Sequence, residues 1–295
     1  MNRKENMVPK QRVLVAGATG YLGKFIVQEL NKQGYWVRAL SRDSQKIAPV
    51  RQYVDEVFLG EATKSETIKG LCKDIDIVFS SLGITKQKDG LTYMDVDYQA
   101  NRNVLNEALT DDVTKFMYIS VLNSNKLRHL EIVKAKEKFA QELKEADIEH
   151  IVIRPNGFFS DMTEFLNMAK RGRVYLIGKG EFRANPIHGA DLAEACVEWL
   201  GSNRGEFDIG GPEILTQNEI ATQAFEVLGK KPNITCIPLM IRSLIIKLVR
   251  IFTSVKTYGP LEFFMTVLAM DMVAPTYGQH TIKEYFKKIS EERNA

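Results

Sequence analysis

Short apolar runs alternate with segments of helical periodicity through the first half of the chain. The first run, residues 13–16, precedes residues 21–33, where apolar side chains recur three and four positions apart on one helical face. Runs that are apolar at every position are typical of parallel strands buried on both sides. Six such strand–helix alternations predict an α/β fold with a doubly wound parallel sheet. We predict the remaining elements as strands at residues 35–40, 55–59, 75–79, 115–120 and 150–153 and helices at residues 65–72, 95–109 and 130–146.

A different pattern begins near residue 160. Pro155 closes the sixth strand because a proline cannot donate to the ladder. We therefore divide the chain into a basic tail (residues 1–11), an α/β core (residues 12–160) and a smaller, mostly helical substrate lobe (residues 161–295) that is partly interleaved with the core. The elements predicted in this lobe are helices at residues 161–170, 191–200 and 217–228 and short strands at residues 174–177 and 205–209.

The segment that begins at Pro238 and ends at Val255 predicts an amphipathic helix with a wide apolar face. At 100° per residue its polar side chains fall within an arc of about 140°. A second apolar segment follows at residues 261–270. The first segment is too charged and the second too short to span a bilayer. Two interpretations stay open: the two helices wall an apolar pocket over the core, or the first helix lies on an anionic membrane surface or on a partner protein.

Three glycines with the spacing G-x-x-G-x-x-G separate the first predicted strand from the first helix. Gly17 permits a sharp turn, Gly20 lets the backbone approach a pyrophosphate, and Gly23 lets the helix pack close to the strand. The free N–H groups and the dipole of the helix then point at the anion. The spacing is one residue wider than G-x-G-x-x-G, so the position between strand and helix carries the prediction of a dinucleotide site. The predicted contacts are Gly17, Thr19, Gly20, Tyr21, Leu22 and Gly23.

The end of the second strand predicts NADP as the cofactor. An NAD site places Asp or Glu here to accept from the ribose hydroxyls. This chain has Ser41 instead, between Arg38 and Arg42, and guanidinium groups suit a 2′-phosphate. We therefore expect NADPH to be preferred over NADH. The alternative is a pair of solvated surface arginines beside Asp43.

Two further segments follow strand ends and complete the predicted cofactor site. Glu61 comes after the third strand, where a carboxylate can contact the amino group of adenine; an ordinary surface acid is the alternative. Small residues follow the fourth strand and leave room for a ligand outside the carboxyl end of the sheet. The predicted contacts there are Ser81, Leu82 and Gly83.

Composition and charge exclude several classes of function. The chain has 295 residues, of which 44% are hydrophobic and 26% charged, and a net charge of +3 that is too small to predict nucleic-acid binding. Its three cysteines and four histidines lie far apart and fit no metal-ligand spacing, so we predict no metal and a reducing compartment. The polar N-terminal segment has no apolar signal region. We expect a cytoplasmic protein, located at a membrane surface if the second interpretation of residues 238–255 holds.

These motifs together resemble the atypical short-chain dehydrogenase/reductase family, in its NmrA-like and divinyl-reductase-like branch. The resemblance covers about residues 11–200 and is carried by residues 17–23, 38–42, 154–159 and 185–193 and by Lys136 with its helix. It implies a Rossmann-type sheet with NADP bound at the Gly17 loop. It also implies a nicotinamide flanked by Ser120, Lys136, Pro155, Asn156, Gly157 and Phe158.

The chain departs from this family at the catalytic pair. Reductases of the family use Tyr-x-x-x-Lys on one helical face, where the lysine lowers the pKa of the tyrosine. Four residues before Lys136 the chain has Ile132, which is not an acid. Some relatives use the lysine alone, so the resemblance still implies a catalytic Lys136 with Ser120. The alternative for Lys136 is a solvated surface charge, and the alternative for Ser120 is a serine that bonds local backbone. Tyr93 and Tyr118 are other candidate proton donors.

Two functions therefore stay open at the level of the sequence. The first is an NADPH-dependent oxidoreductase that transfers hydride to an apolar, conjugated or quinone-like acceptor. The second is a catalytically silent NADP(H)-binding sensor or assembly protein, which the resemblance allows because the branch contains such members. The missing tyrosine weakens a third function, sugar-nucleotide epimerisation.

Overall fold

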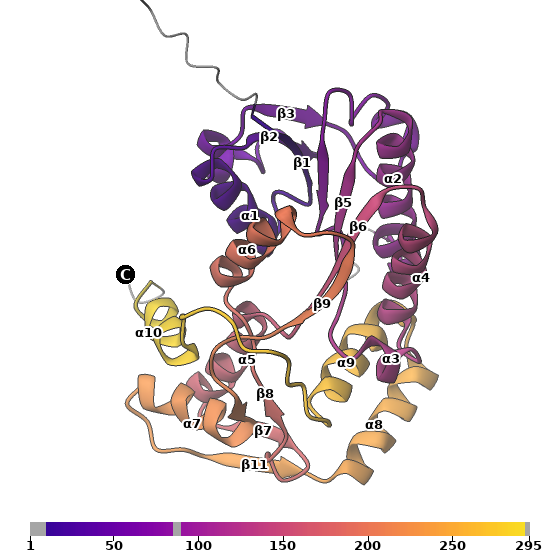
Figure 1. The fold of residues 1–295 in the computed structure, drawn as a ribbon. Coiled ribbons are helices and arrows are strands. Elements are labelled where there is room, and N and C mark those ends of the chain that lie inside the picture. The colour runs from indigo at the N-terminus through magenta and orange to yellow at the C-terminus, as the bar shows by residue number, and fades with distance from the viewer. Residues whose placement is uncertain (1–9, 85–89, 293–295) are drawn as a thin grey trace, which may run out of the picture.

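The computed structural model describes residues 10–84 and 90–292. Seven parallel strands form the central sheet in the order β3-β2-β1-β4-β5-β6-β9 (Figure 1). The predicted α/β fold with a doubly wound parallel sheet is confirmed. The strands are β1 (Arg12–Ala16), β2 (Trp36–Ser41), β3 (Glu56–Leu59), β4 (Ile77–Ser80), β5 (Lys115–Ile119), β6 (Glu149–Pro155) and β9 (Gly205–Ile209).

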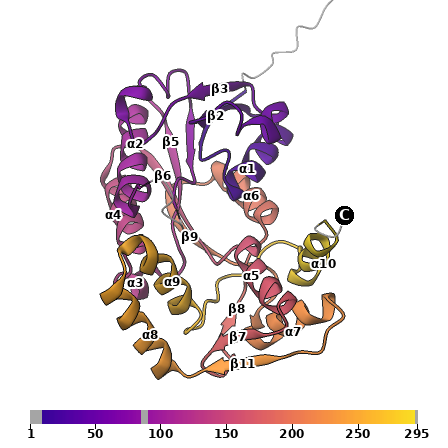
Figure 2. The same ribbon diagram turned by 180° about the vertical axis from the view of Figure 1, so that it is seen from behind.

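Helices cover both faces of this sheet (Figures 1 and 2). Side chains alternate along β1, so that Leu14 packs beneath one pair of helices whereas Val13 and Val15 pack beneath the other. The first pair is α2 (Asn101–Thr110) and α4 (Glu131–Glu145), and the second is α1 (Tyr21–Lys32) and α6 (Gly189–Glu198). A π-helical segment, Met94–Ala100, leads directly into α2. The predicted helix at residues 65–72 is reduced to a 3₁₀ turn, Ser65–Thr67.

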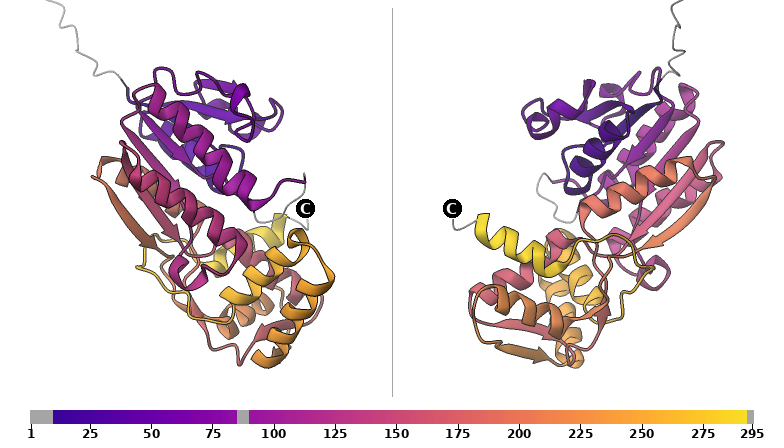
Figure 3. Two further views of the ribbon diagram at one scale, coloured as in Figure 1. Left: turned by 90° about the vertical axis from the view of Figure 1, so that its right-hand side faces the viewer. Right: turned by 60° about the vertical axis from the view of Figure 1, so that its left-hand side comes forward.

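The C-terminal lobe lies beyond the edge of the sheet where β6 and β9 end (Figures 1 and 3). It has its own apolar core around Phe165, Phe225 and Phe286. The seventh strand, β9, belongs to the central sheet although it follows residue 160. The division into a core and a partly interleaved lobe stays a prediction. The lobe contains α5 (Phe159–Lys170), α7 (Gln217–Val227), α8 (Leu239–Phe252), α9 (Val255–Val267) and α10 (Ile282–Glu292), with the strand pairs β7 (Val174–Ile177) with β11 (Ile234–Ile237) and β8 (Arg183–Ala184) with β10 (Leu215–Thr216). A short helix, α3 (Ser124–Leu127), follows β5 and precedes α4.

The predicted helix of residues 238–255 forms α8, which lies at the outer corner of the lobe against α9 (Figures 1 and 2). None of its side chains is buried. The interpretation in which this helix closes over the core is therefore wrong for α8. Within the described residues no helix is both long and apolar enough to cross a membrane.

The helix α6 begins at a histidine that must be neutral to cap it. The Nδ1 atom of His188 accepts a hydrogen bond of 3.2 Å from the backbone N–H of Ala190. The pKa of His188 is lowered to about 4, chiefly by burial and next by the ring of His280, which is stacked on it at 4.2 Å. The nearby carboxylate of Asp191 acts in the opposite direction, and Lys288 adds to the lowering.

The fold should therefore lose stability as the pH falls from 6.5 to about 4. In this window the unfolded chain protonates His188 near its ordinary pKa of 6.5 while the folded protein does not. The unfolded state therefore binds more protons, and the free energy of unfolding decreases as the pH falls. Urea denaturation above and below this window measures the decrease. A His188→Asn variant, which retains a capping acceptor, should show a smaller decrease. An unchanged decrease in the variant would contradict this role of His188.

Candidate functional site

The glycine loop brings the start of α1 very close to the end of β1. A Cβ atom on Gly23 would lie 2.0 Å from the carbonyl oxygen of Gly17, so no larger residue fits. Gly17 has a φ of +94° and its own Cβ would meet the Ser81 hydroxyl at 2.7 Å. No side chain caps α1 and its first turn has no acidic residue. The N–H groups of this turn are therefore free of a competing side-chain acceptor, as a pyrophosphate site requires.

The predicted contacts around this loop differ in what they can offer a ligand. The side chain of Leu22 is buried beneath α1, so only its backbone N–H faces the loop. The hydroxyl of Tyr21 accepts a hydrogen bond of 3.1 Å from Gly189, and burial raises the pKa of this phenol above its ordinary value. Thr19 is half-buried, and Gly20 is exposed. Backbone groups therefore dominate the anion-binding part of the site.

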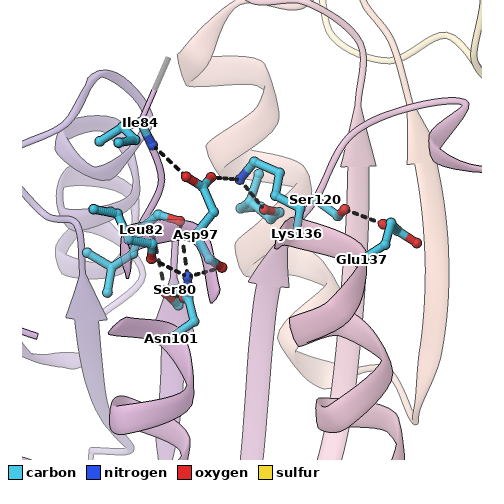
Figure 4. Close-up of polar contacts among 10 residues, drawn as sticks. Ser80, Leu82, Ile84, Asp97, Asn101, Ser120, Lys136 and Glu137 are labelled. Carbon is cyan, nitrogen blue, oxygen red and sulfur yellow. Dashed lines mark hydrogen bonds and ion pairs between the residues drawn. The ribbon is translucent and has the colours of Figure 1, made fainter. Parts of the chain in front are cut away.

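Lys136 lies at the same edge of the sheet and forms an ion pair with a buried acid (Figure 4). Its ammonium nitrogen is 3.1 Å from the Oδ1 atom of Asp97 and donates to the carbonyl oxygen of Ile119 at 3.4 Å. The side chain of Lys136 is 14% exposed and that of Asp97 is fully buried. Lys136 is therefore not a solvated surface charge.

Gly83 lies directly against this ion pair. A Cβ atom at Gly83 would be 2.6 Å from the carboxylate of Asp97 and 2.9 Å from the ammonium of Lys136. The other Asp97 oxygen accepts from the backbone N–H of Ile84 at 3.2 Å. Burial raises the pKa of Asp97, and the charge of Lys136 opposes that rise. The small residues after β4 thus leave the ammonium next to the backbone where a ligand was predicted.

Asp97 and its neighbour Asn101 were not predicted as site residues. The amide of Asn101 donates to the carbonyl oxygens of Leu82 and Asp97, and its oxygen accepts from Ser80 at 2.5 Å (Figure 4). A signal for them was present in the sequence. Asp97 and Asn101 fall at helical spacing on the same stripe as the buried Val104, so two polar residues interrupt an apolar face.

The prediction that Arg38 faces a 2′-phosphate is contradicted by the structure. Its guanidinium is buried on the face covered by α2 and α4, where it donates to the carbonyl oxygens of Leu71 and Lys73, each at 2.8 Å, and pairs with Glu56 at 2.9 Å. The reason is strand geometry, because Arg38 is an interior residue of β2 and points sideways into a layer, not beyond the strand end.

Arg42 is the arginine that remains at the end of β2. Its side chain is half exposed and lies 4.0 Å from the carboxylate of Glu61, which also pairs with Lys64 at 3.0 Å. The hydrogen bond from Lys64 lowers the pKa of Glu61. The hydroxyl of Ser41 donates to the carbonyl oxygen of Asp43 at 2.7 Å and so shapes the turn after the strand.

Two other predicted side chains are held in structural networks. The hydroxyl of Ser120 donates to Glu137 at 2.6 Å, and Glu137 pairs with Arg154 at 3.0 Å, so Ser120 has no free proton for a substrate. The amide of Asn156 donates to Asn185 at 2.9 Å and to the carbonyl oxygen of Met272. We therefore do not retain the side chains of Ser120 and Asn156 as catalytic or cofactor-binding groups.

The loop after β6 nevertheless meets the glycine loop. The rings of Phe158 and Tyr21 lie 5.5 Å apart, and Gly157 lies one residue before Phe158 and two residues after Pro155, the last residue of β6. The two tyrosines considered as proton donors are inaccessible, since Tyr118 is 0% and Tyr93 only 2% exposed. The carboxyl ends of β1, β4 and β6, with Lys136 from α4, thus meet at one edge of the sheet.

Comparison with known proteins agrees with this geometry. Residues 17–203 match a family described as NAD(P)H-binding. The chain is 27% identical to the chloroplastic divinyl chlorophyllide a 8-vinyl-reductase of Arabidopsis thaliana, over 97% of this chain and 79% of that protein. It is 26% identical to the photosystem II assembly factor Ycf39 of Guillardia theta, over 78% of this chain and 74% of that protein. The expected cytoplasmic location of this protein stays a prediction, since the vinyl reductase is named as a chloroplastic protein.

Solved structures show the same fold at low identity. The structure titled AtPrR2 with NADP⁺ and (+)pinoresinol superposes with a TM-score of 0.73 and 17% identity, covering 95% of this chain and 99% of that one. The NADPH complex of the quinone oxidoreductase QOR2 from Escherichia coli gives 0.70 and 14%, with 94% and 99% covered. The chain belongs to the NAD(P)H-binding family.

Proposed function

We propose that the protein is an NADPH-dependent oxidoreductase that reduces an apolar, conjugated or quinone-like acceptor. The observation that carries this proposal is the buried Asp97–Lys136 ion pair beside Gly83, at the same sheet edge as the glycine loop. Relatives named as a vinyl reductase and a quinone oxidoreductase support an acceptor of this kind.

The residues present fit a dinucleotide phosphate. The uncapped first turn of α1 and the close approach at Gly17 and Gly23 suit a pyrophosphate. Arg42 would hold the 2′-phosphate, with Glu61 near the adenine, and Gly83 and Lys136 would lie at the nicotinamide ribose. The cofactor, when bound, supplies a hydride.

Lys136 would then act by electrostatic stabilisation. Asp97 fixes the position of the ammonium, which can stabilise negative charge that develops on the acceptor. The chain has no accessible tyrosine among the candidates considered, since Tyr93 and Tyr118 are buried. An acceptor that spreads charge over a conjugated system suits such a site better than a ketone, which needs a close proton donor.

A second candidate function rests on a different observation. None of the residues of α8 is buried, and one relative is named as an assembly factor. A protein that binds NADP(H) without turning it over and docks onto a partner would use the same loop and the same helix. It differs from the oxidoreductase in one measurable respect, because no acceptor would oxidise its bound NADPH.

Cofactor selectivity should depend on Arg42 and not on Arg38. Replacing Arg42 by Met removes a charge-assisted contact, so NADPH affinity should fall about 10-fold or more while NADH affinity stays nearly constant. Arg38→Met is the matched control: it should lower the free energy of unfolding, because Arg38 holds two carbonyl oxygens and Glu56, and leave the ratio of affinities unchanged. Fluorescence titration with both nucleotides measures the ratio. An unchanged ratio in Arg42→Met would contradict the assignment.

Turnover should depend on the ammonium of Lys136. Lys136→Met should lower acceptor-dependent NADPH oxidation about 100-fold while NADPH still binds. Lys134→Met, on the same helix but paired with Glu131 at the surface, should retain activity.

A further variant separates chemistry from folding in this experiment. Lys136→Met alone leaves the carboxyl group of Asp97 buried without a counterion, which destabilises the protein. The double variant Lys136→Met/Asp97→Asn has no buried charge at this place, so it should recover stability and remain inactive. If it turned over at the wild-type rate, the role of Lys136 would be refuted.

A further inference from the structure

The helix α8 exposes an apolar surface on its outward side. Among the described residues, eight of the thirteen large apolar side chains that are exposed lie between residues 239 and 261. Met240 is 86% exposed, Phe252 78% and Ile251 73%. Apolar groups at such exposure are unfavourable in water and mark an interaction surface when they are contiguous.

Six of the seven exposed apolar side chains of α8 share one face of the helix, and Leu239 at its first position is the exception. At 100° per residue Met240, Ile251, Leu244 and Leu248 fall within an arc of about 80°, and Ile241 and Phe252 widen it to about 120°. Arg242 and Val249, on the opposite side, are partly buried toward the lobe. The apolar face therefore points away from the protein.

Polar contacts fasten α8 to α9 with this face outward. The guanidinium of Arg242 donates to the carbonyl oxygen of Met265 at 2.9 Å and to the hydroxyl of Thr266 at 2.8 Å. Arg250 pairs at 2.6 Å with Glu262, whose side chain is 7% exposed. Both arginines thus act within the protein, and the orientation of the helix is fixed without burial of its apolar side chains.

The charged residues of α8 and of the first turn of α9 have one sign. No Asp or Glu occurs between residues 239 and 261, whereas Lys247 and Lys256 occur there besides the two arginines, and Glu262, which pairs with Arg250, has a side chain only 7% exposed. Lys247 and Lys256 are exposed and form no ion pair within the described part of the chain. Lys247 lies at the margin of the apolar face, where its stem can lie along lipid and its ammonium can reach a phosphate.

We propose that α8 lies in the interface of an anionic lipid bilayer, with its apolar face among the acyl chains and its lysines at the headgroups. An apolar face with a lysine at its margin and no acidic residue on the helix is the pattern of a helix that lies on such a surface. With 14 residues α8 is about 21 Å long, too short to cross a hydrocarbon core of about 30 Å. The docking does not depend on the proposed reaction.

Docking through α8 would place the candidate site near the bilayer. A Cβ atom on Gly259 of α9 would lie 3.0 Å from the ring of Tyr93, which directly precedes the π-helical segment that carries Asp97. The α8–α9 pair therefore packs against the element that positions Lys136. If the proposed function holds, an acceptor dissolved in the membrane would have a short path to the site.

Vesicle flotation of the full chain tests this inference. The wild type should float with vesicles of phosphatidylglycerol and phosphatidylcholine, float much less with phosphatidylcholine alone, and be released by high salt. Ile251→Ser/Phe252→Ser should lower the bound fraction about 10-fold, and Lys247→Glu/Lys256→Glu should abolish the preference for anionic vesicles. Tyr175→Ser/Ile214→Ser, which alters exposed apolar residues elsewhere, is the matched control and should float like the wild type.

Three results would overturn the inference. The first is a wild type that stays out of the vesicle fraction with both lipids. The second is an Ile251→Ser/Phe252→Ser variant that floats as well as the wild type. The third is a wild type that does not float but forms a dimer in size-exclusion chromatography, with the dimer lost in this variant. The last result would assign the face to a second copy of the chain. NADPH binding, measured in parallel, should be the same in all these variants and distinguishes loss of docking from loss of fold.

Discussion

The arrangement of the candidate site depends on one ion pair, between Asp97 and Lys136. A fully buried carboxylate needs a counterion, and removal of one partner from a buried pair typically costs about 3–5 kcal/mol. The pair therefore ties the π-helical segment before α2 to α4, across the ends of β4 and β5. It also holds the ammonium against Gly83. Among the described glycines, Gly83 is the only one at which an added Cβ would meet this ion pair.

The glycine loop and the ion pair are two rigidly held features at the same edge of the central sheet. Close packing at Gly17 and Gly23 fixes the start of α1, and the ion pair fixes the cation about one strand further along the sheet. A dinucleotide spans such a distance across the carboxyl ends of a doubly wound sheet. The lobe beyond this edge contributes α9, which packs against Tyr93 just before the segment that carries Asp97 and forms a helical pair with the outward α8.

The sequence predicted the layers of the fold because strand and helix periodicities are local. It failed for Arg38 because the partners of that residue, Glu56 and the carbonyl oxygens of Leu71 and Lys73, lie 18 to 35 residues away. It located Lys136 but could not show the partner Asp97. For α8 the periodicity predicted an apolar face without telling whether protein or solvent covers it, since both give the same pattern along the chain.

The most direct test of the central claim is a titration of the wild-type protein with NADPH, followed by addition of quinones and enones to the complex. The fluorescence of the bound nicotinamide reports binding, and its absorbance reports oxidation. The account predicts saturable binding and a loss of absorbance that depends on protein, acceptor and Lys136. Saturable binding without oxidation by any acceptor would contradict the proposed reaction and favour the assembly or sensor function, and absence of binding would contradict the assignment of the glycine loop.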